Sequence, residues 1–271
     1  MSAPTAASMP TAAGIAMGRW VIETKRFLRQ RESVVFTIGL PVLLLVIFGS
    51  VFNKDIAPGV TYSQYFAAGM IASGLVNSGF QALAIGVGIE RDNGGLKRLS
   101  GSPMPKPSYF AGKFLLVATI SALQIALLMI IGIAAFGLDV PSAKGWITLA
   151  WLWALGGFTC ALLGIAFSSV PRDAESAPAI VTPIVLVLQF ISGVFFQYDQ
   201  LPSWMQHVAA IFPLKWLTQG MRSVFLPSSF QSQEVSGSWQ LPLVFLVLVI
   251  WGVIGAVLCV RTFRWQRRGE D

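Results

Sequence analysis

Charged residues are scarce in this sequence. Asp, Glu, Lys and Arg make up 11% of the 271 residues, whereas hydrophobic residues make up 55%. Soluble domains carry about 25% charged residues, so this composition excludes a domain that folds around one core in water. It is typical instead of a chain whose apolar segments cross a bilayer, where a hydrocarbon core of ~30 Å requires roughly 20 residues of helix.

Residues for catalysis, metal binding and cofactor binding are also few. The sequence has one histidine, His207, and two cysteines, Cys160 and Cys259, both inside apolar segments. These numbers exclude a Ser-His-Asp site on the cytoplasmic side, and they predict neither a disulfide framework nor a metal site. The motif G-x-x-x-x-G-K-[ST] is missing, so the chain has no P-loop for a nucleotide. We therefore predict a protein that is not an enzyme and binds no cofactor itself.

Acidic residues are missing from the interiors of the long apolar segments. Carboxylates at such positions form the proton and sodium relays of many secondary transporters. Their absence argues against a transporter driven by an ion gradient. The energy for any transport is therefore expected to come from another polypeptide.

What the sequence does contain is six apolar segments of membrane-spanning length. None shows the alternation of a barrel strand, so each is predicted to be a helix. The predicted spans are residues 33–52, 65–89, 110–138, 145–170, 177–196 and 241–260. The predicted fold class is an all-α integral membrane protein with six transmembrane helices.

The distribution of Lys and Arg sets the expected orientation. With the N-terminus inside, fifteen of the nineteen basic residues lie in segments on the cytoplasmic side. The positive-inside rule therefore predicts a multi-pass protein of the plasma (inner) membrane with both termini in the cytoplasm. The net charge of +7 follows from this topology, so we expect no nucleic-acid partner.

Two further elements are predicted before the first span. Residues 1–14 are rich in Ala, Ser, Thr and Pro, which indicates a disordered tail. Residues 15–31 combine apolar and basic side chains at helical spacing, which is typical of an amphipathic helix in contact with membrane lipids. Such a helix serves either as a plain anchor or as part of a docking surface. Its predicted interface residues are Trp20, Lys25, Arg26, Phe27 and Arg29.

The connection between the fifth and sixth spans, residues 197–240, is long, and its part from 201 to 227 is too apolar for a free loop and too polar for a span. Pro213 divides it into two pieces, and Trp204 and Trp216 suit the headgroup level of a membrane. We expect two short re-entrant helices in the outer leaflet, with protein covering their ends.

A polar stripe is predicted on the second span. Ser73, Asn77 and Gln81 lie at positions i, i+4 and i+8, so a continuous α-helix places them on one face. Such a stripe either hydrogen-bonds a neighbouring helix or lines a translocation path. The sequence leaves both alternatives open.

The connector between the second and third spans concentrates charge. Residues 90–113 include seven charged side chains, a Gly-Gly pair and three prolines. The glycines allow a sharp turn, and the next four residues form about one helical turn. A short helix of mixed charge suits the docking of an energy-supplying partner, whereas the alternative is a basic loop that only follows the positive-inside rule. The candidate coupling residues are Glu90, Arg91, Asp92, Gly94, Gly95, Leu96, Lys97, Arg98 and Leu99.

This connector resembles the first cytoplasmic loop of the type 2 ABC-transporter permeases, the exporter class that includes the daunorubicin-resistance permeases. The matching residues are Glu90, Arg91, Gly94, Leu96, Leu99, Pro103, Gly112 and Lys113. The segment FPLKWLTQGMR, residues 212–222, is similar to the segment before the last span of that family. The resemblance covers nearly the whole chain after residue 15 and implies one permease domain over residues 15–271.

The resemblance implies the membrane subunit of an ATP-driven exporter. Two copies of a P-loop ATPase subunit would hold ATP and Mg, and a second permease copy, identical or a sister subunit, would complete the assembly. The expected substrates are hydrophobic drugs or lipid-like molecules. The alternatives are a permease that exports polysaccharide or glycolipid, and a secondary transporter or membrane scaffold that needs no ATPase.

Overall fold

The computed structural model describes residues 11–52 and 54–266, and most of them are helical. The first and second spans each contain a π-helical segment, η1 and η2, between α-helical segments. The elements in chain order are α1 (Ala12–Arg29), α2 (Arg31–Val34), η1 (Val35–Gly39), α3 (Leu40–Val51), β1 (Asp55–Ala57), β2 (Val60–Thr61), α4 (Tyr62–Leu75), η2 (Val76–Gln81), α5 (Ala82–Asp92), α6 (Gly95–Ser100), α7 (Lys106–Phe136), α8 (Ala143–Phe167), α9 (Ser176–Ile191), η3 (Tyr198–Gln200), α10 (Ser203–Ile211), α11 (Pro213–Phe225), η4 (Ser228–Gln233) and α12 (Leu241–Thr262).

Five helical segments are long and apolar enough to cross a membrane, and α9 is apolar but shorter, with 16 residues. The five are Arg31–Val51, Tyr62–Asp92, Lys106–Phe136, Ala143–Phe167 and Leu241–Thr262. The predicted fold class is therefore confirmed as a mostly helical membrane protein with five to six spanning helices. The antiparallel β1–β2 hairpin is a small exception to the all-α prediction.

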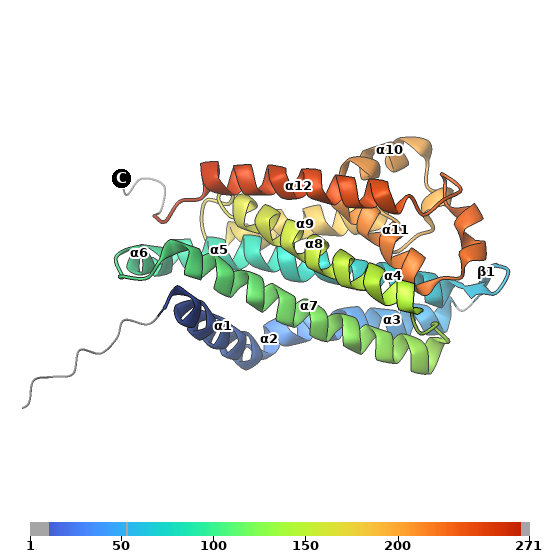
Figure 1. The fold of residues 1–271 in the computed structure, drawn as a ribbon, viewed down its shortest axis with the longest axis horizontal. Coiled ribbons are helices and arrows are strands. Elements are labelled where there is room, and N and C mark those ends of the chain that lie inside the picture. Colours follow the sequence, from blue (N-terminus) through green and yellow to red (C-terminus); the bar gives the residue numbers. More distant parts are fainter. Residues whose placement is uncertain (1–10, 53, 267–271) are drawn as a thin grey trace, which may run out of the picture.

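The described ends of the chain lie at the same end of the helix bundle (Figure 1). This end also carries α6 and the last turn of α12, whereas β1, α10 and α11 lie at the opposite end. A chain that starts and finishes at one end has crossed an even number of times. We therefore count α9 as a crossing despite its length.

The two short helices expected between the last two spans are present as α10 and α11, and α11 begins at Pro213. A proline is well tolerated in the first turn of a helix, where its missing N–H has no intrahelical partner to lose. Nearly all of α11 is buried, because it packs against α4, α8 and α12. Protein rather than lipid therefore surrounds this helix.

The core is centred on the second span. Residues 65–75 of α4 are all buried, and the helix packs against α3, α7, α8 and α11. Small residues allow η2 and α8 to approach closely. A Cβ atom at Gly164 would lie 2.6 Å from the Phe80 carbonyl oxygen, and one at Gly79 would lie 2.7 Å from the Cys160 Cβ. These two glycines therefore fix the distance between the second and fourth spans.

The N-terminal boundary differs from the prediction. α1 begins at Ala12, and the Thr11 hydroxyl caps it by accepting a hydrogen bond of 3.2 Å from the Gly14 amide. The composition of residues 1–14 predicts a disordered tail, but residues 12–14 are helical. A threonine N-cap overrides this compositional signal because it satisfies one of the free N–H groups of the first turn. Residues 1–10 lie outside the described part of the chain.

Candidate functional site

The predicted helical turn after the second span is present as α6. Gly94 adopts φ +68°, the left-handed conformation that glycine reaches without a steric cost, and this turns the chain from α5 into α6. Leu96 is fully buried in a cluster with Val87 and Tyr109. Lys97 and Arg98 are exposed on the outer side of the same turn. α6 is thus a short helix that is anchored by one leucine and presents two cations.

Glu90 lies in the last turn of α5, just before α6, and its side chain faces the interior of the protein. Its carboxylate accepts hydrogen bonds from Lys113 Nζ at 2.6 Å and from the Tyr109 hydroxyl at 2.8 Å. The same Lys113 Nζ lies 3.1 Å from the Glu23 carboxylate, and Arg26 lies 3.6 Å from Glu90. These contacts join the end of α5 to α7 and to α1. We refer to Glu23, Glu90, Tyr109 and Lys113 as the charge cluster.

Arg91 is buried, and it contacts other parts of the chain than Glu90 does. Its guanidinium donates to the Ser168 carbonyl, to the Ser168 hydroxyl at 3.0 Å and to the Arg264 carbonyl at 2.9 Å. The neighbouring Asp92 carboxylate accepts a hydrogen bond of 3.2 Å from the Ala174 amide. Arg91 and Asp92 therefore tie α5 to the α8–α9 connector and to the segment after α12.

These positions correct the sequence interpretation of the connector. Glu90 and Arg91 were expected to form part of a docking surface, but Arg91 is buried, the Glu90 side chain is only 12% exposed, and both are bonded within this chain. The exposed part of the candidate coupling segment is confined to α6 and its flanks, where Lys97 and Arg98 lie. Glu90 and Arg91 hold the helices in place, and of the later residues Lys97 and Arg98 face outward while Leu96 is buried.

A pocket of about 470 Å³ opens beside Arg91 at the same end of the bundle. Three further arginines line it: Arg172 from the α8–α9 connector, Arg261 from the end of α12, and Arg264. Asp92 and Asp173 line the same pocket.

The predicted interface helix is α1, and it is docked on α7. The Trp20 indole N–H donates to the Thr119 hydroxyl at 2.9 Å. A Cβ atom at Gly112 would lie 2.9 Å from the Arg19 Cβ, so the two helices touch closely. Lys25, Arg26 and Arg29 are exposed, and Phe27 is half-buried. α1 therefore contacts the bundle through one face and presents basic side chains on another.

The ion pair between Glu23 and Lys113 was not predicted from the sequence. Glu23 was not among the predicted interface residues, although it is the only acidic residue of α1. It stands three residues after Trp20 and four before Phe27, on the packing face of the helix. An acidic residue on that face is a signal for a buried cation partner, since buried carboxylates are paired.

The predicted polar stripe on the second span is interrupted. Ser73 is fully buried and donates to the Met70 carbonyl of its own helix at 2.9 Å. Asn77 accepts from the Gln189 amide at 2.9 Å, and Gln81 donates to the Thr182 hydroxyl at 3.2 Å. The π-helical turn η2 changes the angular spacing, so the three residues do not share one face. The two later residues link the second span to α9, which favours the interhelical alternative over a path.

Comparison with known proteins places these features in one family. The ABC-2 type transporter family matches residues 20–226. "Inner membrane transport permease YadH" of Escherichia coli K12 is 23% identical over 249 residues, which are 89% of this chain and 91% of YadH. "Capsule polysaccharide export inner-membrane protein CtrC" of Neisseria meningitidis is 28% identical over 144 residues, 53% of this chain and 52% of CtrC. "Probable multidrug ABC transporter permease YbhR" of Escherichia coli K12 is 21% identical over 184 residues, 68% of this chain and 50% of YbhR.

The family match covers well over half of the chain and includes α6 together with the α5 and α7 ends that hold it. The chain therefore belongs to the ABC-2 type transporter family, and it is a non-catalytic, multi-pass membrane permease subunit.

Proposed function

We propose that this permease receives the movement of its ATPase through α6. A permease of the ABC-2 type works with an ABC ATPase subunit and binds no cofactor itself, so ATP and Mg belong to the ATPase. The observation that carries the proposal is the contrast within α6. Lys97 and Arg98 are exposed, whereas Leu96 is fully buried against α5 and α7. A partner that pushes on the exposed face would move the helices beneath it.

The charge cluster supports a route from α6 into the bundle. Lys113 links α7 to Glu90 of α5 and to Glu23 of α1. A displacement of α6 would therefore carry the second span, the third span and the interface helix together. Charged side chains at the surface would guide the ATPase to this position, because complementary charge favours the correct encounter.

The proposed transport direction is export, and the proposed substrates are hydrophobic drugs or lipid-like molecules. The similarity to YbhR, whose name describes a multidrug transporter, supports this class. The similarity to CtrC, whose name describes capsule polysaccharide export, supports polysaccharide or glycolipid as a second candidate. Two permease copies, identical or sister subunits, and two ATPase subunits would form the working assembly.

The docking proposal is tested by charge reversal at α6. The double variant Lys97→Glu/Arg98→Glu should insert normally, because both side chains are exposed, but it should retain less of the co-purifying P-loop ATPase. The matched control is Lys54→Glu, an exposed lysine directly before β1, the hairpin strand that lies at the opposite end of the bundle. Undiminished ATPase recovery with the double variant would show that α6 is not the docking element.

The substrate class is tested with the reconstituted permease–ATPase complex. Hydrophobic cationic dyes and lipid analogues should stimulate ATP hydrolysis if the first proposal is right. Stimulation by an acidic oligosaccharide or its lipid-linked form, without an effect of the dyes, would favour the polysaccharide alternative.

A further inference from the structure

Two cations of α11 lie inside the protein at the end of the bundle opposite α6, and their surroundings differ. Arg222 is completely buried and forms an ion pair with Glu234, with a distance of 2.6 Å from Nε to one carboxylate oxygen and 3.2 Å from Nη2 to the other. Its Nη1 donates to the Gly193 carbonyl at 3.3 Å. Arg222 thus has a full counter-charge and satisfied donors.

Lys215 lies two helical turns before Arg222 and is 7% exposed. Its ammonium donates a hydrogen bond to the neutral side-chain oxygen of Gln219. Among the residues that the structure describes, no carboxylate lies within ion-pair distance of it. Glu234 lines the same pocket and acts on Lys215 at longer range, but both oxygens of its carboxylate are bonded to Arg222. Lys215 is therefore a buried cation with neutral hydrogen-bond partners.

Aromatic rings hold this cation without neutralising it. Lys215 Nζ lies 3.7 Å from the centre of the Trp216 ring and 5.3 Å from the centre of the Tyr198 ring. Such contacts stabilise an ammonium group by about 0.5–2 kcal/mol, which is less than the cost of burying an unpaired charge. An ammonium has three N–H donors, and one of them has a hydrogen-bond partner among the described residues.

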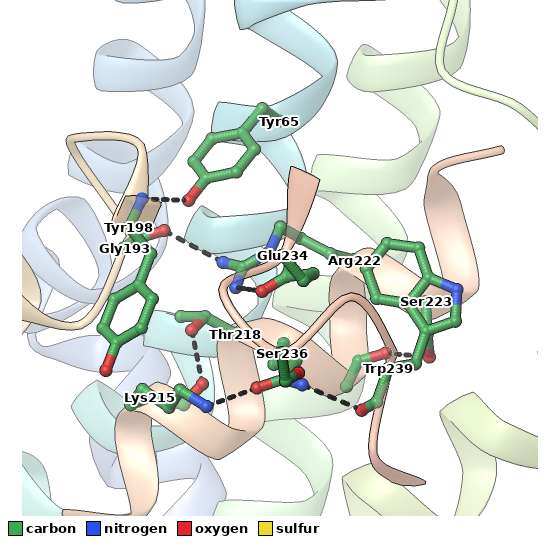
Figure 2. A network of polar contacts seen from close by, with 12 residues as sticks. Tyr65, Gly193, Tyr198, Lys215, Thr218, Arg222, Ser223, Glu234, Ser236 and Trp239 are labelled. Carbon is green, nitrogen blue, oxygen red and sulfur yellow. Dashed lines mark hydrogen bonds and ion pairs between the residues drawn. The ribbon is translucent and has the colours of Figure 1, made fainter. Parts of the chain in front are cut away.

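The cation faces a pocket of about 260 Å³ between α10, α11 and the segment before α12. Figure 2 shows Lys215, Tyr198 and Ser236 around this region, with the Arg222–Glu234 pair beside them. The remaining polar lining consists of Gln206, His207, Gln219, Glu234 and Gln240. The pocket therefore combines the Lys215 cation with a carboxylate that is paired with Arg222, with amide and hydroxyl groups, and with the Tyr198 ring.

We propose that this pocket binds a phosphate group, with the Lys215 ammonium as its counter-charge. A lysine is a compact, strongly hydrated point charge and is a common phosphate ligand. The amide and hydroxyl side chains suit the ester or hydroxyl groups that accompany a phosphate in a lipid headgroup or a soluble phosphate ester. This inference goes beyond the export function, because the site binds phosphate whether or not α6 engages an ATPase.

The test measures binding by the purified full-length chain, without an ATPase. Inorganic phosphate is titrated by calorimetry in neutral detergent, and bound phosphatidylglycerol is counted by native mass spectrometry after exchange from nanodiscs. Lys215→Gln should weaken binding about tenfold or more, the loss expected for one charged hydrogen bond. The Lys215→Gln variant is expected to fold, because the substitution removes an unpaired buried charge. Thermal unfolding of the variant checks that it does.

Gln219→Glu is the second variant and Lys144→Gln is the control. The new carboxylate would stand at the hydrogen-bonding position of Lys215 and compete with the ligand, so binding should fall although the lysine is retained. Lys144 is exposed in the first turn of α8, near α11, and its loss should change nothing.

The two probes identify the source of the phosphate. If both pocket variants lose phosphatidylglycerol binding but keep phosphate binding, the ligand is a lipid headgroup. If they lose phosphate binding but keep phosphatidylglycerol binding, the ligand is a soluble phosphate. The proposal is overturned if the parent chain binds neither probe, or if both pocket variants bind as tightly as the parent. That outcome would leave the docking of the ATPase at α6 untouched, because the assay includes neither ATPase nor export.

Discussion

Lys113 and Glu90 form a buried ion pair, with 2.6 Å between Nζ and Oε1, that joins α7 to the end of α5. Lys113 also contacts Glu23 of α1, so one ammonium neutralises carboxylates from two other helices. The side chains of Lys113 and Glu90 are 5% and 12% exposed. Water therefore screens the pair little, and the three helices are held as one unit next to α6.

Removal of this ammonium should destabilise the permease. Lys113→Met leaves the carboxylates of Glu90 and Glu23 buried with fewer partners, and the loss of one member of a buried pair costs about 3–5 kcal/mol. The measurement is the free energy or midpoint of unfolding of the purified protein in detergent. Arg26→Met is the matched control: Arg26 is largely exposed and lies 3.6 Å from Glu90, so its loss should cost less than about 1 kcal/mol. Equal losses for the two variants would contradict the role of the charge cluster.

Gly94 should be more sensitive to substitution than Gly101, although the two glycines flank the same short helix. Gly94 has φ +68°, where a side chain costs about 1–2 kcal/mol, whereas Gly101 has φ −82° and only ordinary contacts around it. Gly94→Ala should therefore lower both stability and ATPase co-purification, because the strain changes the direction of α6. Gly101→Ala should affect neither. The paired unfolding and pull-down measurements would refute this if Gly101→Ala were the more damaging change.

Local sequence is enough to predict some features of this fold but not the burial of its charged residues. The spans were predictable from local hydropathy, the turn at α6 from Gly94, and the division of the outer connection from Pro213. The burial of Glu90 and Arg91 was not predictable in this way. Their partners Lys113, Ser168 and Arg264 are 23, 77 and 173 residues away, and no local pattern specifies such contacts.

The polar stripe shows a second limit. The spacing of Ser73, Asn77 and Gln81 assumed a regular α-helix, and the π-helical turn η2 removed that regularity. The turn lies where Gly79 and Gly164 allow two spans to approach closely, and the spacing of residues within one span does not report such a contact. The Arg222–Glu234 pair was not predictable either, because the two residues are 12 positions apart and no local pattern specifies their contact.

The stability of the protein should depend on pH through Lys215. Burial lowers the pKa of Lys215 from 10.5 to about 8, with Glu234 opposing the shift and Arg222 adding to it. Between these values the unfolded chain binds a proton that the folded chain has released, so stability should rise as pH increases from 8. By pH 10 the gain should be about 2 kcal/mol.

The pH range in which stability reports on Lys215 ends near pH 10. Burial raises the pKa of Tyr198, beside Lys215, to about 12, and a raised tyrosine pKa lowers stability as pH increases above its ordinary value of 10. Unfolding should therefore be compared between pH 8 and pH 10 for the parent and for Lys215→Gln. The same rise in both proteins would rule out Lys215 as its origin.

The orientation of the bundle should place α6 in the cytoplasm and η4 outside. Ser100 and Ser232 are both exposed, and the native Cys160 and Cys259 are buried, so single cysteines at the two serines give a clean comparison. In intact cells a membrane-impermeant maleimide should label Ser232→Cys and spare Ser100→Cys. After the membrane is opened it should label both. The reverse pattern in intact cells would invert the topology.

The most direct test of the account is a crosslink from α6 to the ATPase. A cysteine at Lys97, on the exposed side of the helix, is combined with a short bifunctional thiol reagent in membranes that contain the co-purifying ATPase, and Lys54→Cys at the far end is the control. If α6 receives the ATPase, a permease–ATPase crosslink forms from position 97, ATP binding changes its yield, and none forms from position 54. An active complex with no crosslink from position 97 or from Arg98→Cys would contradict the claim that α6 receives the ATPase.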